Sequence, residues 1–129
     1  MKKDNKGFTL AELLIVVAII AVLVAISIPI FTTQLENSRE ATDAANVRSA
    51  YAEVVAAALN DGTKDITATV AKTQKVEDWQ NTNIEDIGGV KVGDGIKSTV
   101  SSEIKYDSST GKVTIDGIEV ESKITSTSN

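Results

Sequence analysis

The sequence contains no cysteine and no histidine. Their absence excludes disulfide bonds, thiolate nucleophiles, zinc sites built from these residues, and the histidine bases of most catalytic triads. A glycine-rich phosphate loop and a recognisable pair of catalytic carboxylates are also missing. We therefore expect a protein that is not an enzyme and that binds no cofactor or metal.

Positive charge is scarce over most of the chain. The net charge is −5, and the excess of acidic over basic side chains lies beyond residue 29. An acidic surface repels the phosphate backbone of nucleic acids. We expect no direct binding of nucleic acid.

Charged residues are almost absent from residues 8–28, where Glu12 stands alone among apolar side chains. A helix rising about 1.5 Å per residue would make this run roughly 31 Å long, close to the thickness of a bilayer core. Lys2, Lys3 and Lys6 precede the run. By the positive-inside rule, the N-terminal end stays cytoplasmic and the bulk of the chain lies outside.

The sole proline, Pro29, follows this run and predicts a helix kink, because it removes one backbone hydrogen bond. Residues 29–61 continue as the amphipathic second half of the same helix, ending near Leu59. Its apolar face has spacings of three, four and seven, at Ala41, Ala44, Tyr51, Val55 and Ala58. We expect the acidic residues Glu36, Glu40, Asp43 and Glu53 to lie mostly elsewhere, and Gly62 to form a left-handed cap.

Residues 62–129 predict a small β-rich region. Strand signals fall at 66–70, 103–106, 112–115 and 118–120, with turns at 107–111 and at Asp116-Gly117. Gly88-Gly89 and Asp94-Gly95 indicate a loop region, Trp79 a core position, and residues 122–129 a fraying end. The predicted fold class is α+β: a long N-terminal helix, transmembrane in its first half, packed on a small antiparallel sheet.

The segment Lys6-Gly7-Phe8-Thr9-Leu10-Ala11-Glu12 resembles the type IV pilins and pseudopilins. Precursors of that family have a basic leader ending in glycine, then phenylalanine, then an apolar helix with glutamate as its fifth residue. The resemblance implies a leader of residues 1–7, cleavage between Gly7 and Phe8 by a prepilin peptidase, and methylation of the new Phe8 amine. It also implies that Glu12 meets this amine on a neighbouring subunit. Many pilins have glycine where this chain has Ala21, so any unwinding here would depend on Pro29.

Two alternatives concern the same segment. Ala25-Ile26-Ser27 is a small-x-small pattern that an ordinary signal peptidase would cut, which would remove the anchor. The apolar run is long for a signal peptide, and it contains Glu12, which favours cleavage at Gly7. Glu12 itself would have no role if it only reached lipid headgroups, or it would pair with Phe8 one turn away in its own chain.

Four acidic residues near the C-terminus are candidate calcium ligands, as in some pseudopilins: Asp107, Asp116, Glu119 and Glu121. Their spacing fits no ligand loop, which favours a solvated acidic surface.

The leading interpretation is a structural subunit of a type IV pilus that polymerises with its own copies. It would be a single-pass membrane protein before assembly and part of an extracellular filament afterwards. The expected partners are the lipid bilayer, a prepilin peptidase and a membrane assembly platform. One alternative is a pseudopilin of a type II secretion or competence apparatus; another is a single-pass protein with a ligand-binding outer domain.

Overall fold

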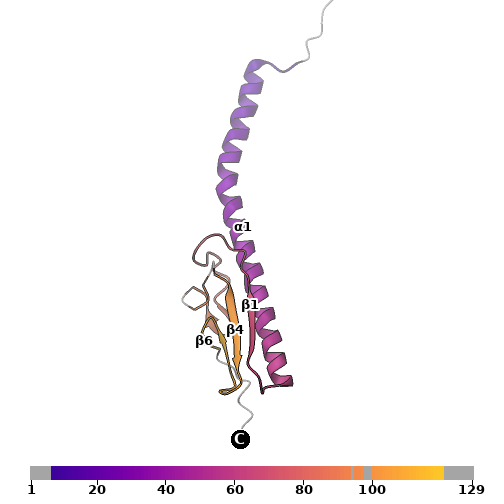
Figure 1. The fold of residues 1–129 in the computed structure, drawn as a ribbon. Coiled ribbons are helices and arrows are strands. Elements are labelled where there is room, and N and C mark those ends of the chain that lie inside the picture. Colours follow the sequence, from indigo (N-terminus) through magenta and orange to yellow (C-terminus); the bar gives the residue numbers. More distant parts are fainter. Residues whose placement is uncertain (1–6, 94, 98–99, 121–129) are drawn as a thin grey trace, which may run out of the picture. The chain divides into compact units, whose positions relative to one another are not determined.

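The computed structural model describes residues 7–93, 95–97 and 100–120. This part of the chain contains one long helix followed by short strands (Figure 1). In chain order the elements are α1 (Leu10–Asn60), β1 (Ile66–Val70), β2 (Asp86–Ile87), β3 (Val90–Lys91), β4 (Ser102–Asp107), β5 (Lys112–Ile115) and β6 (Ile118–Glu119). The predicted α+β class, a long helix on a small antiparallel sheet, is confirmed. Glu121 and the predicted frayed end 122–129 lie outside the described residues.

α1 includes Pro29 and divides between two compact units of the chain, one ending at Leu35 and the other beginning at Glu36. The helix ends at Asn60, within one residue of the predicted end. The predicted left-handed cap at Gly62 is wrong, because Gly62 does not have a positive φ. Glycine is needed there for space: a Cβ would lie 3.0 Å from the Tyr106 hydroxyl and 3.1 Å from the Ala58 carbonyl oxygen.

The main sheet has the strand order β1-β4-β5-β6 and is antiparallel throughout. β4 is central, and Ile104 on it pairs with Ala68 of β1 and with Ile115 of β5. Asp116 and Gly117 join β5 to β6 with φ angles of 52° and 82°. Two successive positive φ angles are typical of the tight turn that matches strand twist, so the predicted turn is confirmed.

A second, two-stranded sheet is a feature that the sequence prediction missed. β2 and β3 pair across Gly88 and Gly89, which both have positive φ, at 61° and 84°. The prediction gave this region as a loop, because strands of two residues are too short to show alternation. The pair of glycines, which suits a two-residue hairpin turn, was the available signal.

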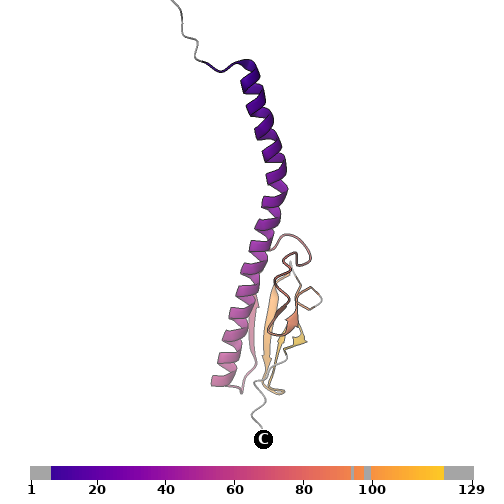
Figure 2. The same cartoon turned by 180° about the vertical axis from the view of Figure 1, so that it is seen from behind.

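The hydrophobic core lies between the second half of α1 and the sheets (Figures 1 and 2). Small residues of α1, namely Ala44, Val47, Ala50 and Val54, are buried against isoleucines and valines of the later chain. The predicted apolar face was partly right. Ala44 is buried and Tyr51 and Val55 pack at the edge of the core, but Ala41 is exposed.

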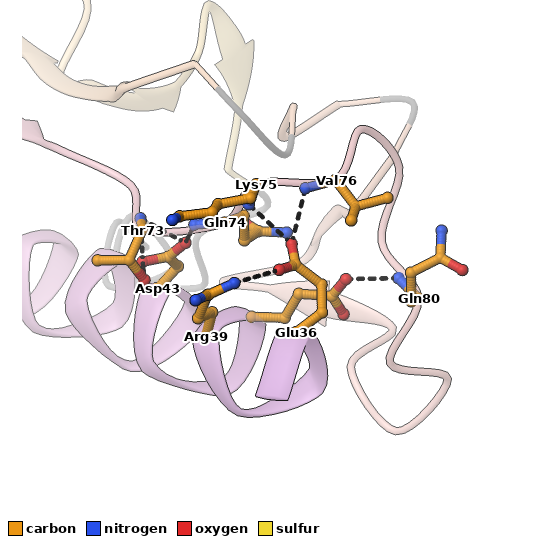
Figure 3. Close-up of polar contacts among 9 residues, drawn as sticks. Glu36, Arg39, Asp43, Thr73, Gln74, Lys75, Val76 and Gln80 are labelled. Carbon is orange, nitrogen blue, oxygen red and sulfur yellow. Dashed lines mark hydrogen bonds and ion pairs between the residues drawn. The ribbon is translucent and has the colours of Figure 1, made fainter. Parts of the chain in front are cut away.

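The prediction that the acidic residues of this helix lie away from the packed face is wrong for three of them. Glu36, Glu40 and Asp43 are buried, whereas Glu53 is exposed. Their burial is possible because their carboxylates accept hydrogen bonds from backbone N–H groups of the segment 73–81 (Figure 3). Trp79 of that segment packs against the core, as expected, and its indole N–H donates to the Ile96 carbonyl oxygen at 2.7 Å.

Substituting a buried residue of β4 tests this core directly. Ile104→Ala removes a side chain that is 0% exposed, and we expect a loss of about 2–5 kcal/mol in the free energy of unfolding. Ile118→Ala is the matched control, because Ile118 is 41% exposed, and it should cost about 1 kcal/mol or less. Urea unfolding of the full chain in detergent micelles, followed by Trp79 fluorescence, measures both. Equal losses for the two variants would contradict the core assignment.

Candidate functional site

The N-terminal turn of α1 is closed by reciprocal hydrogen bonds between Thr9 and Glu12. The Thr9 carbonyl oxygen accepts the Leu13 N–H at 3.1 Å, which makes Thr9 the N-cap residue. The Glu12 N–H donates to the Thr9 hydroxyl oxygen at 3.2 Å, and the Thr9 N–H donates to a Glu12 carboxylate oxygen at 2.8 Å. This arrangement is a capping box. The sequence interpretation missed it, although the Thr-x-x-Glu spacing was the available signal.

Gly7 and Phe8 precede the helix and are freely accessible. Phe8 is 79% exposed, and no atom lies within 4 Å of the position that a Cβ on Gly7 would occupy. A protease needs an accessible backbone, and the Gly7–Phe8 junction is exposed and outside the helix. The capping box places the Glu12 carboxylate on the first turn, beside the backbone that leads to Phe8.

The first half of α1 exposes its apolar side chains on every side. Each residue from Gly7 to Leu35 is exposed. Within the described residues, α1 is the one helix whose length and composition would allow it to cross a membrane. A helix that is apolar all round must be covered by lipid or by other helices, because water around it is unfavourable.

Near Pro29, side-chain hydroxyls of α1 donate hydrogen bonds to carbonyl oxygens of the same helix. The Thr32 and Thr33 hydroxyls both donate to the Pro29 carbonyl oxygen, at 2.9 and 3.0 Å, and the Ser27 hydroxyl donates to the Leu23 carbonyl oxygen at 2.6 Å. Such hydroxyl-to-backbone bonds weaken and bend helices slightly. They add to the effect of the missing proline N–H at this turn. The kink itself stays a prediction.

The candidate calcium ligands are used within the chain as hydrogen-bond acceptors. Asp107 accepts from the Ser109 hydroxyl and N–H, which lowers the pKa of its carboxyl. Asp116 accepts from the Ser102 hydroxyl and the Glu103 N–H, joining the β5–β6 turn to β4. The Lys112 ammonium lies 3.1 Å from a Glu119 carboxylate oxygen. Among the described residues no group of three possible ligands faces a common point.

Comparison with known proteins gives three findings. The family described as "Prokaryotic N-terminal methylation motif" matches residues 2–28. Fimbrial protein Q of Moraxella bovis is 35% identical over 100 residues, which cover 78% of this chain and 57% of that protein. The type IV narrow pilus major component PilA5 of Thermus thermophilus is 52% identical over 50 residues, which cover 36% of this chain and 43% of that protein. No solved structure matches.

The chain thus spans about half the length of the curated relatives it matches. The chain combines three features: a prokaryotic N-terminal methylation motif, a long helix with an apolar first half, and a small antiparallel sheet. In its N-terminal motif and in sequence, the chain is thus similar to a fimbrial protein and to a type IV pilus component.

The capping box predicts how the first helical turn responds to mutation. Thr9→Ala removes the acceptor of the Glu12 N–H, which should destabilise the turn by about 0.5–2 kcal/mol. We expect faster amide hydrogen exchange at Glu12 in the full chain in detergent micelles. Thr9→Ser is the matched control, because it keeps the hydroxyl. An unchanged exchange rate in Thr9→Ala would show that Thr9 does not cap the helix.

Proposed function

We propose that this chain is the structural subunit of a type IV pilus, cut between Gly7 and Phe8 by a prepilin peptidase and polymerised through α1. The observation that supports this most is the order of three features. An accessible Gly-Phe junction comes first, a carboxylate one turn into a helix comes next, and an entirely exposed apolar helical surface follows. The role is structural rather than enzymatic.

Before assembly the apolar half of α1 lies in the lipid bilayer, with Lys2, Lys3 and Lys6 on the cytoplasmic side. Cleavage after Gly7 leaves the anchor attached, because the cut precedes the helix. An ordinary signal peptidase cutting after Ser27 would instead release the chain. The mature subunit therefore stays in the membrane, available to the assembly platform, until it enters a filament on the cell surface.

In the filament, the apolar halves of neighbouring helices replace lipid as the cover for each other. Cleavage creates an ammonium on Phe8, which is then methylated and keeps its positive charge. Glu12 supplies the compensating negative charge on a neighbouring subunit and so sets the axial register. A carboxylate among apolar residues is costly unless it is paired, so addition in the wrong register leaves two unpaired charges.

Identifying the first residue of the mature subunit tests the proposed processing site. Mass spectrometry of filaments sheared from the cells should give a subunit that begins with N-methylated Phe8. Gly7→Leu should leave uncut precursor in the membrane, and because nothing occupies the space beside Gly7, the fold cannot be the reason. Gly7→Ala, which adds far less bulk, is the control and should be cut more completely. A mature protein that begins at Ile28, or filaments that retain Met1, would contradict the proposal.

Because Glu12 also caps the helix, a pair of substitutions can separate the effect of its charge from the effect of the cap. Glu12→Ala removes both the charge and the cap, whereas Glu12→Gln removes the charge and retains a residue suited to the box. Losing one member of a buried charge pair costs about 3–5 kcal/mol, on the order of a thousandfold per subunit addition. We expect both variants to be cut and inserted normally but to yield few or no filaments.

Glu12→Asp keeps the charge with a shorter reach and should assemble partially. The measurement compares cut subunit in membranes with subunit sheared from the cell surface, and electron microscopy of the sheared material shows filament length. Normal filament yield from Glu12→Gln would mean that capping, rather than charge, is the contribution of Glu12.

A further inference from the structure

Three carboxylates of α1 hold a segment that has no regular secondary structure. We call residues 73–81 the strap, and Glu36, Glu40 and Asp43 together the clasp. Each member of the clasp accepts two consecutive backbone N–H groups of the strap. Glu36 accepts those of Lys75 and Val76 at 2.8 and 2.9 Å, and Glu40 accepts those of Gln80 and Asn81 at 2.6 and 2.5 Å.

Asp43 completes the clasp at the start of the strap. It accepts the Thr73 and Gln74 N–H groups at 2.8–2.9 Å, and the Thr73 hydroxyl at 2.8 Å. The spacing of residues 36, 40 and 43 places all three carboxylates on one helix face. Figure 3 shows the carboxylates of Glu36 and Asp43 pointing from the helix toward the strap.

From this geometry we propose that the clasp is a proton-sensitive switch: it holds the strap on α1 when ionised and releases it when protonated. A protonated carboxyl carries an O–H donor on one oxygen. Both oxygens of Glu40 accept a strap N–H, and so do both oxygens of Asp43. Protonation therefore places an O–H donor on one of the oxygens that accept a strap N–H, and it removes the negative charge that strengthens these hydrogen bonds. A part-buried N–H whose acceptor is weakened or lost is unfavourable, so the strap detaches.

Glu36 differs because one of its oxygens accepts both strap amides and the other accepts the Arg39 guanidinium at 3.2 Å. Burial acts to raise the pKa of Glu36, but hydrogen bonds from Val76, Lys75 and Arg39 and the Arg39 charge hold it below the ordinary value of 4.5. A lowered folded-state pKa contributes stability that is fully present above the ordinary value, and this contribution is lost as pH falls through the folded-state pKa. The attachment at Glu36 is thus present at neutral pH and lost in acid.

The other charged groups near the clasp are Lys72 and three charged residues of the strap. Lys72 interacts with Asp43 and Asp116, and burial lowers its pKa despite both carboxylates. The charged residues of the strap itself, Lys75, Glu77 and Asp78, are exposed. The release therefore depends on the three carboxylates of the clasp.

Release of the strap changes how much of α1 the globular unit covers. Glu36, Glu40 and Asp43 are the first buried residues of the helix, and the next is Ala44. With the strap attached, coverage begins at Glu36; with the strap detached, it begins at Ala44. Acid therefore exposes about two further turns of α1 while the apolar core stays packed.

Trp79 lies within the strap and reports its attachment. Its indole N–H donates to the Ile96 carbonyl oxygen, and the Lys72 ammonium lies 5.0 Å from its ring centre. Detachment should move the ring into water and shift its emission to longer wavelength. The full chain in detergent micelles is titrated from about pH 7 to about pH 3, with Trp79 emission and far-ultraviolet circular dichroism recorded on the same samples. We expect the red shift below about pH 4.5, at a pH where the dichroism is still native.

Glu40→Gln mimics the protonated state, because an amide has one oxygen and one N–H₂ donor group. At neutral pH it should show the red shift and lose protection from hydrogen exchange by roughly tenfold or more at Gln80 and Asn81. Glu53→Gln is the matched control, because Glu53 is an exposed carboxylate on the same helix, and it should behave as the unmodified chain.

Three results would overturn the proposal. The first is an emission change that coincides with the loss of helix and sheet signal, which would mean global unfolding. The second is emission that stays unchanged to about pH 3, which would mean that the clasp does not need ionised carboxylates. The third is a Glu40→Gln chain that matches Glu53→Gln in both emission and exchange. None of these readouts depends on filament formation, so the outcome is independent of the proposed pilus function.

Discussion

Hydrogen bonds from backbone N–H groups to helix carboxylates attach the strap to α1, and they determine where the buried part of the helix begins. The strap joins neither sheet, so its part-buried amides need acceptors from another element. Glu36, Glu40 and Asp43 provide them, and their own burial is acceptable because each is hydrogen-bonded. The same contacts position Trp79 against the core and so connect the polar clasp to the apolar packing.

The clasp also explains why the two halves of α1 differ so strongly in composition. From Gly7 to Leu35 no side chain is buried by the chain itself, and the residues there are suited to lipid or to other copies of the helix. From Glu36 onward one face carries both small apolar residues and three carboxylates, because that face must satisfy both an apolar sheet and a polar strap. A single helix thus carries two surfaces that need different partners.

Several acidic residues outside the clasp have the same role as its members, because each accepts a hydrogen bond from a backbone N–H group. Glu12 accepts a backbone N–H at the start of α1, and Asp61 accepts one after its end. Asp65, just before β1, and Asp107, at the end of β4, accept the N–H groups of Ser108 and Ser109, and these hydrogen bonds lower the pKa of both carboxyls. At these positions the carboxylates satisfy backbone donors within the chain.

The amino-acid sequence alone was sufficient to predict the features that depend on interactions between residues close in the chain. The length of the helix, the strands at 66–70 and 112–115 and the turn at Asp116-Gly117 follow from periodicity and turn chemistry. The N-terminal methylation motif is also recognisable from the sequence, since it depends on neighbouring residues. Tertiary structure alone decided that helix carboxylates would be buried, because the donors that satisfy them are backbone amides some 30 to 41 residues away. Backbone amides are identical in every residue except proline, so no pattern of side chains reveals which of them a carboxylate will bind.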